Sequence, residues 1–255
     1  MSQTAAQLTD HVFPRLPVGQ WVLSLLIPLR LLLAAQPQLV TPVLQVVHRV
    51  ITRHLLGQAG LKPDEADSGA VTLIQRFRSA ANLNIHLHCL VLDGVYRRGA
   101  DGTPEFVEVA APTDEALQAV LHRSITRLMK LLTRQGVVVE EEEGSTYIAD
   151  NDGDSDEART LRPLQAAAFT YRIAFGPRVG QEVLTVQGAM PRQMAFKQTL
   201  CADINGFSLQ AALRCAADDR DALEQLCRYI TRPALANDRV QTNATGQVVL
   251  KLKTA

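Results

Sequence analysis

Two runs of β-forming residues, separated by a short turn-like segment, place the strongest constraint on how this chain folds. The first run is AVTLIQRF at residues 70–77, and the second is NIHLHCLVLDGVY at residues 84–96. The segment RSAANL between them consists of small and polar residues with one leucine. This combination predicts an antiparallel β-hairpin. A third run, EFVEVA at residues 105–110, predicts a further strand of the same meander.

Alternation in the second run puts two histidines on one face of the hairpin. Successive side chains of a strand point to opposite faces. His86 and His88 therefore share one face, and the apolar residues that alternate with them share the other: Ile85, Leu87, Cys89 and Val91. Two imidazoles at positions i and i+2 can bind one divalent metal ion together. In a strand taken by itself, however, this pattern is more often structural than metal-binding.

The cross-strand register selects a third candidate ligand. If Phe77 pairs with Asn84, then Gln75 lies directly opposite His86, with the two Cβ atoms within about 5.5 Å. Its side-chain amide would then be on the same face as the histidines. The pattern thus predicts a metal site of His86, His88 and Gln75. A shift of the strand register by one residue would turn Gln75 to the other face.

Amphipathic and apolar segments surround the hairpin. A buried strand is predicted at residues 20–28, and further strands at 206–215 and 247–253. Helices are predicted over residues 41–56, 113–135 and 218–231. With 47% hydrophobic residues, the chain can bury a substantial core. The expected fold class is α+β, with a central, mainly antiparallel sheet and flanking helices.

The charges balance overall but are unevenly distributed. The chain has 26 Lys and Arg residues and 26 Asp and Glu residues, and nine of the acids lie between Arg134 and Arg159, where there is no base. The remainder has 17 acids against 26 bases, a net charge of +9. Such an excess favours a polyanionic partner. We interpret residues 140–157 as an acidic loop.

One predicted helix has a basic stripe beside its apolar stripe. In the helix at 113–135, the basic residues recur at spacings of four, three and four: Arg123, Arg127, Lys130 and Arg134. At 100° per residue these side chains lie along one side of the helix. The stripe could run along a phosphate backbone, or it could be a solvated outer face, and the pattern leaves both readings open.

Neither a membrane span nor a disulfide framework is predicted. The longest apolar run, Trp21 to Leu33, contains Pro28 and Arg30 and is shorter than the roughly 20 residues that cross a bilayer. The four cysteines lie far apart, without a C-x-x-C pair. We therefore expect a cytoplasmic protein with no membrane partner.

Two strings together carry a family resemblance: QRFRSAANLNIHLHCLVLDGVY around the histidines, and LEQLCRYITRP, which contains Tyr229. In these strings, and over essentially the whole chain, the sequence resembles the HUH-type transposases of the bacterial IS ninety-one and insertion-sequence common-region (ISCR) group. Their hallmark is a histidine, hydrophobic residue, histidine triplet, matched by His86, Leu87 and His88. A catalytic tyrosine follows on a later helix, matched by Tyr229, which by position alone would be a packing residue.

The resemblance implies an HUH endonuclease-like fold and rolling-circle DNA transposition, by a bacterial protein that is associated with the nucleoid when it binds DNA. His86 and His88 would hold Mg²⁺ or Mn²⁺, and Tyr229 would attack single-stranded DNA at an element terminus to give a 5′-phosphotyrosine. Arg228 and Arg232, beside the tyrosine, could contact phosphates.

The chain departs from the family pattern in two ways. Gln225 and Pro233 lie four residues before and after Tyr229, so only one nucleophile is expected, as in the common-region branch. Full-length members also carry an N-terminal zinc-binding region and further C-terminal sequence. Residues 19–255 therefore resemble a truncated catalytic domain, preceded by a lead-in or linker at 1–18. A non-catalytic DNA-binding remnant is the alternative.

Overall fold

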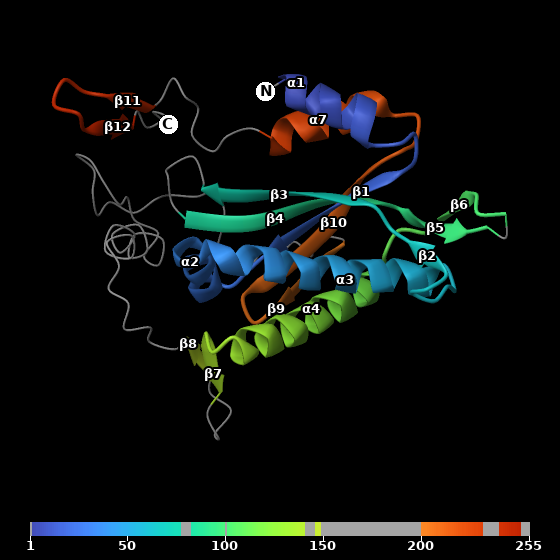
Figure 1. The fold of residues 1–255 in the computed structure, drawn as a ribbon, viewed down its shortest axis with the longest axis horizontal. Helices are drawn as coiled ribbons and strands as arrows, with labels where there is room; N and C mark the ends of the chain where they lie inside the picture. The colour runs from blue at the N-terminus through green and yellow to red at the C-terminus, as the bar shows by residue number, and fades with distance from the viewer. Residues whose placement is uncertain are drawn as a thin grey trace, which may run out of the picture.

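A five-stranded sheet forms the centre of the computed structural model, which describes residues 2–77, 83–99, 101–140, 146–148, 200–231 and 240–250. The strands are β1 (Val18–Ser24), β3 (Ala70–Phe77), β4 (Leu83–Leu92), β9 (Cys201–Ile204) and β10 (Phe207–Cys215). Their order is β3-β4-β1-β10-β9, and every neighbouring pair is antiparallel (Figure 1). Helices lie on both faces, so the predicted α+β class is confirmed.

Three helices cover one face of the sheet and form the larger core with it. They are α2 (Ile27–Ala35), α3 (Val40–Gln58) and α4 (Asp114–Arg134), drawn below the sheet in Figure 1. Their apolar stripes pack against alternate strand residues, among them Trp21, Leu87 and Leu209, which are almost completely buried. Removing this apolar surface from water is the dominant favourable contribution to folding.

The opposite face carries a smaller core. It is built by α1 (Ser2–Gln7), the π-helix η1 (Leu8–Val12) and α7 (Arg220–Ile230), which contact one another above the sheet in Figure 1. The buried residues of this core are Ala5, Phe13, Val18, Leu90, Leu92, Cys215, Leu223, Leu226 and Cys227. The lead-in expected over residues 1–18 is thus helical from Ser2 to Val12 and packs on α7, because Ala5 and Phe13 bury apolar surface there.

Smaller strand pairings flank the main sheet. One three-stranded sheet contains β2 (Ala66–Asp67), β5 (Gly94–Arg98) and β6 (Pro104–Glu108). Two hairpins pair β7 (Val138–Glu140) with β8 (Thr146–Ile148), and β11 (Val240–Thr242) with β12 (Val248–Leu250). The strand predicted at 105–110 is therefore present, but in a separate sheet from β3 and β4. The predicted acidic loop begins inside the β7–β8 hairpin, and its residues 141–145 and 149–157 lie outside the described residues.

The helices α4 and α3 begin in different ways. The Thr113 side chain caps α4 by accepting a hydrogen bond from the Ala116 backbone N–H at 3.2 Å, and Gly136 follows the helix with φ of 69°. Helix α3, predicted to begin at residue 41, begins at Val40. The cause is a preceding 3-10 turn, η2 (Pro37–Leu39), which leads directly into α3.

The hairpin register agrees with the prediction where the candidate site lies. Gln75 pairs with His86, and residues 70–75 all keep the predicted offset to β4. A bulge between Gln75 and Phe77 places Phe77 opposite Leu83, not opposite Asn84 as assumed. Because the bulge lies on the turn side of Gln75, it leaves Gln75 on the histidine face.

No single helix in the described part of the chain is long and apolar enough to cross a membrane. The helical segments Ile27–Ala35 and Pro37–Gln58 have the length and composition of a span only as a pair, which is bent by 110°. Both contribute buried residues to the larger core.

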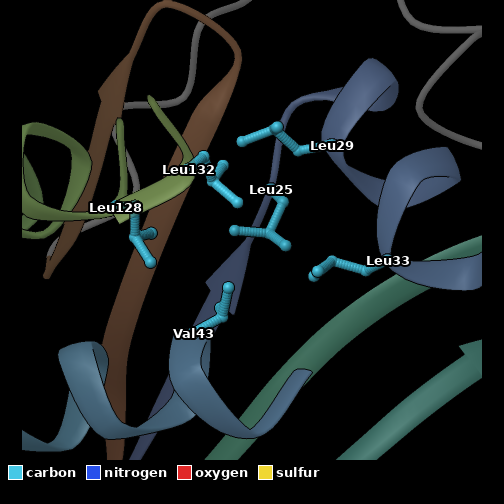
Figure 2. Close-up of a pocket in the computed structure, with 6 residues that line it drawn as sticks. All are labelled: Leu25, Leu29, Leu33, Val43, Leu128 and Leu132. Atoms are coloured by element: carbon cyan, nitrogen blue, oxygen red, sulfur yellow. The ribbon is translucent and has the colours of Figure 1, made fainter. Parts of the chain in front are cut away.

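A small apolar pocket lies where β1 leads into α2 and meets α3 and α4. Figure 2 shows Leu25 among side chains from all three helices: Leu29, Leu33, Val43, Leu128 and Leu132. Leu25 itself is 1% exposed. Its side chain therefore connects the end of β1 to the helical layer.

Substituting Leu25→Ala should lower the free energy of unfolding by about 2–5 kcal/mol. The change removes buried methyl groups beside an existing gap, so the neighbouring side chains cannot easily fill the space. Urea unfolding followed by circular dichroism measures the loss. Leu213→Ala is the matched control, because Leu213 is 46% exposed and should cost less than about 1 kcal/mol. Equal losses in the two variants would contradict the prediction.

An ion pair between an arginine and a buried carboxylate joins β10 to the turn between β4 and β5. The Arg214 Nε donates to the Asp93 Oδ2 at 2.7 Å, and the Asp93 side chain is 6% exposed. The turn is also tied by backbone hydrogen bonds from Asp93 N–H to Pro17 O and from Val109 N–H to Asp93 O. Gly19 is needed beside the carboxylate, since a Cβ there would lie 2.6 Å from Oδ1.

We expect Arg214→Met to destabilise the fold by about 3 kcal/mol at neutral pH, because it leaves the Asp93 carboxylate buried without its partner. Burial raises the pKa of Asp93, and Arg214 opposes that rise. A carboxyl whose pKa is raised in the folded state costs stability once it ionises. The deficit should therefore shrink as pH falls through the raised folded-state pKa of Asp93.

Urea unfolding at several pH values would measure this dependence. Arg97→Met is the control, because Arg97 pairs with Glu105 at the surface, where both side chains are well exposed, and should cost less than about 1 kcal/mol. A deficit in Arg214→Met that is independent of pH would contradict the role given to Asp93.

Candidate functional site

Five polar side chains lie together on the sheet face that α7 packs against. They come from three adjacent strands: Gln75 on β3, His86 and His88 on β4, and Gln20 and Ser24 on β1. Their common face follows from the register, because Ser24 and Gln75 both pair with His86. His88 lies two residues from His86 and Gln20 lies four residues from Ser24, and even spacings along a strand keep side chains on one face. We call these five residues the histidine cluster. Further along the same face, Val18, Leu90 and Leu92 contact the smaller core under α7.

His88 is held between two glutamines. Its Nε2 lies 3.1 Å from the Gln75 Oε1, and its Nδ1 lies 3.1 Å from the Gln20 Nε2. Both His88 and Gln20 are buried. Burial lowers the pKa of His88, which favours the neutral imidazole, the form that binds metal ions.

His86 is held from the neighbouring strand by a hydroxyl. The Ser24 Oγ lies 2.6 Å from the His86 Nδ1. The imidazole rings of His86 and His88 have centroids 6.4 Å apart and are tilted by 59°. Strand β1 therefore supplies a hydrogen-bond partner to the Nδ1 atom of each histidine.

The donor types of this cluster fit a divalent metal ion. Imidazole nitrogens and amide oxygens are both common ligands. The 3.1 Å between the His88 Nε2 and the Gln75 Oε1 matches the spacing of adjacent ligands around octahedral Mg²⁺, about 3.0 Å. The ring centroids of His86 and His88 are wider apart than the roughly 5 Å that two adjacent imidazole ligands allow, so the His86 ring must turn toward His88 to share an ion.

Carboxylates do not complete a ligand set in the part of the chain that the structure describes. No group of three His, Cys, Asp or Glu side chains converges there. A metal ion in the histidine cluster would thus have two imidazoles and the Gln75 amide as protein ligands, and its remaining positions would be open to water or phosphate oxygens.

Tyr229 lies in the last turn of α7 and is 64% exposed. The helix buries Leu223, Leu226 and Cys227 against the sheet, and Tyr229 points away from that stripe. The Asp219 side chain caps the start of α7 by accepting a hydrogen bond from the Ala222 N–H at 3.0 Å. The structure therefore puts the tyrosine helix and the histidine cluster on one face of the sheet.

The structure describes one of the two arginines predicted beside Tyr229. Arg228 is exposed and forms an ion pair with Glu224, one turn earlier, at 2.7 Å between Nη2 and Oε1. An exposed pair of this kind is worth less than about 1 kcal/mol, so a phosphate can compete for the guanidinium. Arg232 lies outside the described residues.

The basic stripe is on the other side of the molecule. Its residues lie on the outer side of α4, exposed except for a half-buried Arg127: Arg123, Arg127, Lys130 and Arg134. The buried residues of α4 pack in the larger core, on the sheet face opposite the histidine cluster. A straight nucleic acid segment therefore cannot contact the stripe and the cluster at once, which sequence spacing could not reveal.

Sequence reasoning missed Gln20 and Ser24 as parts of the cluster. Both stand in the strand VGQWVLS, where two polar residues four positions apart, and so on one face of an otherwise apolar strand, were an available signal. On the opposite face of β3, the Thr72 Oγ1 lies 2.6 Å from the Nε2 of His48, which is half-buried on α3. Pairings between distant segments decide all three contacts.

Comparison with known proteins identifies the family. Residues 69–255 match the family model Y2_Tnp, described as "Putative transposase". No curated protein and no solved structure matches the chain. The matched region begins just before β3 and takes in the hairpin histidines and the helix with Tyr229. Because the match covers well over half of the sequence, this chain belongs to the Y2_Tnp family of transposases.

Proposed function

We propose that this transposase is an HUH-type enzyme that nicks single-stranded DNA and transfers the strand through a 5′-phosphotyrosine, in a rolling-circle mode. The observation that carries the proposal is the shared sheet face: His86, His88 and Gln75 lie on the side against which α7 packs, and α7 presents Tyr229 to solvent. A covalent mechanism needs both a nucleophile that DNA can reach and a site that binds the reacting phosphate.

His86, His88 and Gln75 would hold Mg²⁺ or Mn²⁺. Bound there, the ion would neutralise charge on the phosphodiester and orient it. Ser24 and Gln20 are hydrogen-bond partners of the Nδ1 atoms of the two imidazoles, and such partners of ligand histidines are important for metal affinity. The amide of Gln75 is uncharged and would not neutralise the bound ion, so both positive charges of the ion would remain available to attract the phosphate.

Tyr229 would be the nucleophile. Its oxygen forms a bond to phosphorus, the bond between phosphorus and the 3′ oxygen breaks, and the tyrosine proton ends on that oxygen as a free 3′-hydroxyl. The energy of the cleaved bond is kept in the phosphotyrosine, so a later attack by a 3′-hydroxyl can rejoin the strand without ATP. Arg228, one residue earlier on the exposed side of α7, could contact a neighbouring phosphate.

The test is a covalent adduct. The full chain is incubated with single-stranded oligonucleotides from the two ends of its own element, labelled at the 3′ end, and run on a denaturing gel. We expect a labelled adduct with Mn²⁺ and none with EDTA, because the protein stays on the 5′ end of the downstream fragment. An adduct that forms only from 5′-labelled DNA, or equally in EDTA, would contradict the mechanism.

A second candidate is a DNA-binding protein that does not cleave. The 6.4 Å separation of the two imidazole rings, together with the lack of a converging carboxylate among the described residues, favours it. Such a protein would show DNA binding that weakens steeply with salt and would form no adduct with any divalent metal.

A further inference from the structure

The amide of Gln20 makes a contact that constrains where the proton of His88 sits. The Gln20 Nε2 is a donor only, so the His88 Nδ1, 3.1 Å away, must accept from it. A neutral imidazole carries one proton, which must then be on Nε2. This agrees with the other side of the ring, where the Gln75 Oε1, 3.1 Å away, can only accept. The two glutamines together select the Nε2–H tautomer of His88.

This tautomer cannot bind a metal ion through Nε2. A ligand nitrogen needs its lone pair, and in this state the Nε2 carries the proton. Binding at the position between His88 and Gln75 requires the proton to be on Nδ1, and Nδ1 must then donate. Gln20 can accept that bond only by turning its amide so that Oε1 faces the ring.

We propose that Gln20 is a positioning residue that switches His88 between a metal-free tautomer and a metal-binding tautomer by turning its amide; this rests on the proposed metal site. An amide serves both states because one end donates and the other accepts. Gln20 and His88 are buried, at 8% and 7% exposure, so water is a poor substitute for either partner.

Ser24 holds His86 without such a constraint. Its Oγ lies 2.6 Å from the His86 Nδ1, and a hydroxyl can donate or accept after rotating about one bond. The two histidines therefore differ: either tautomer of His86 can keep its bond to Ser24, whereas a change of tautomer at His88 requires the Gln20 amide to turn. Metal binding at His88 must exchange the hydrogen bonds that Gln20 and Gln75 make with its ring.

Gln20→Glu tests the proposal, because a carboxylate can only accept and so selects the Nδ1–H tautomer. The control is Gln210→Glu, which adds the same charge on the same sheet face, since Gln210 and His88 both pair with Val22. Gln210 is two strands from His88, roughly 10 Å. We expect Gln20→Glu to bind Mn²⁺ at least about tenfold more tightly than Gln210→Glu by calorimetry.

Nitrogen-15 NMR of the histidine rings reads the tautomer directly. At about pH 8, where an ordinary histidine is neutral, we expect His88 of the metal-free parent to be the Nε2–H tautomer. Saturation with Mg²⁺ should convert it to Nδ1–H, and Gln20→Glu should show Nδ1–H before metal is added. The tautomer of His88 measured in the parent protein tests the proposal even if Gln20→Glu fails to fold.

The two possible failures can be told apart. If the metal-free parent shows Nδ1–H at His88, or if the two glutamate variants bind Mn²⁺ equally, then Gln20 is not a switch, although the metal site stands. If the parent binds neither Mn²⁺ nor Mg²⁺, the metal site itself fails, and the inference about Gln20 fails with it.

Discussion

Replacing Tyr229 with phenylalanine should abolish the covalent protein–DNA adduct, lowering its yield by at least about 1,000-fold, because the substitution removes the only proposed nucleophilic oxygen. The ring of Tyr229 is 64% exposed, so loss of its hydroxyl should change the free energy of unfolding by less than about 0.5 kcal/mol. Loss of the adduct would therefore show that the reaction is blocked, and not that the protein has unfolded. The denaturing-gel assay with Mn²⁺ gives the measurement.

Tyr96→Phe is the matched control for this substitution. Tyr96 lies on β5, where its ring packs edge-on against Phe106 with centroids 5.3 Å apart. The change removes the same atom from another tyrosine and should leave the adduct at the parental level. An adduct of undiminished yield in Tyr229→Phe would show that another group attacks the phosphate. Salt-dependent DNA binding that persists without the adduct would show that Tyr229 acts after binding.

Substituting His86→Ala should weaken Mn²⁺ binding by at least about tenfold and reduce adduct formation in parallel, because the site would lose one of its two imidazole ligands. His86 is the better choice of the two histidines for this experiment. It is half-buried and held by Ser24, whereas His88 is buried between two glutamines whose amides would lose their partner. Titration calorimetry of the metal-free protein gives the affinity.

The control for the metal experiment is His122→Ala. His122 is exposed on α4, in the helical layer on the opposite side of the sheet, so its removal should not change Mn²⁺ affinity. Excess Mn²⁺ should restore part of the adduct in His86→Ala, since a weakened site can still be filled by mass action. Unchanged Mn²⁺ affinity in His86→Ala would remove the proposed site.

The separation of the basic stripe from the histidine cluster limits how DNA could be bound. Arg123 and Lys130 lie on the outer side of α4, and the cluster lies beyond the sheet. DNA at the cluster would be contacted by groups on that same face, of which Arg228 is an exposed cation on α7. If the stripe binds DNA at all, it contacts a second segment or a strand that passes around an edge of the sheet.

Local patterns predicted the hairpin well, and the reason is geometric. Successive side chains of a strand point to opposite faces, so His86 and His88 had to share a face. Counting across a short connection also gave the pairing of Gln75 with His86, even though a bulge displaced the assumed partner of Phe77. The wrong partner assumed for Phe77 does not affect the candidate site, because the bulge lies outside the segment that contains the candidate ligands.

Contacts between distant segments were not predictable in this way. β1 pairs with β4 across almost seventy residues of chain, and that pairing brings Gln20 and Ser24 to the histidines. Nothing near Gln20 in the sequence indicates which strand will lie beside it, because strand order depends on how all the strands and helices bury their apolar faces together. The same holds for the first helices, which pack on α7 across some two hundred residues.

The sequence by itself determined the hairpin, the faces of its side chains, the position of Gln75 opposite His86, and the family to which the chain belongs. Only the tertiary structure decided that α7 and Tyr229 share a sheet face with the histidines, that the basic stripe does not, and that the Gln20 amide lies against His88. The physical reason is that periodicity places a side chain on a face of its own element, whereas burial of apolar surface decides which faces meet.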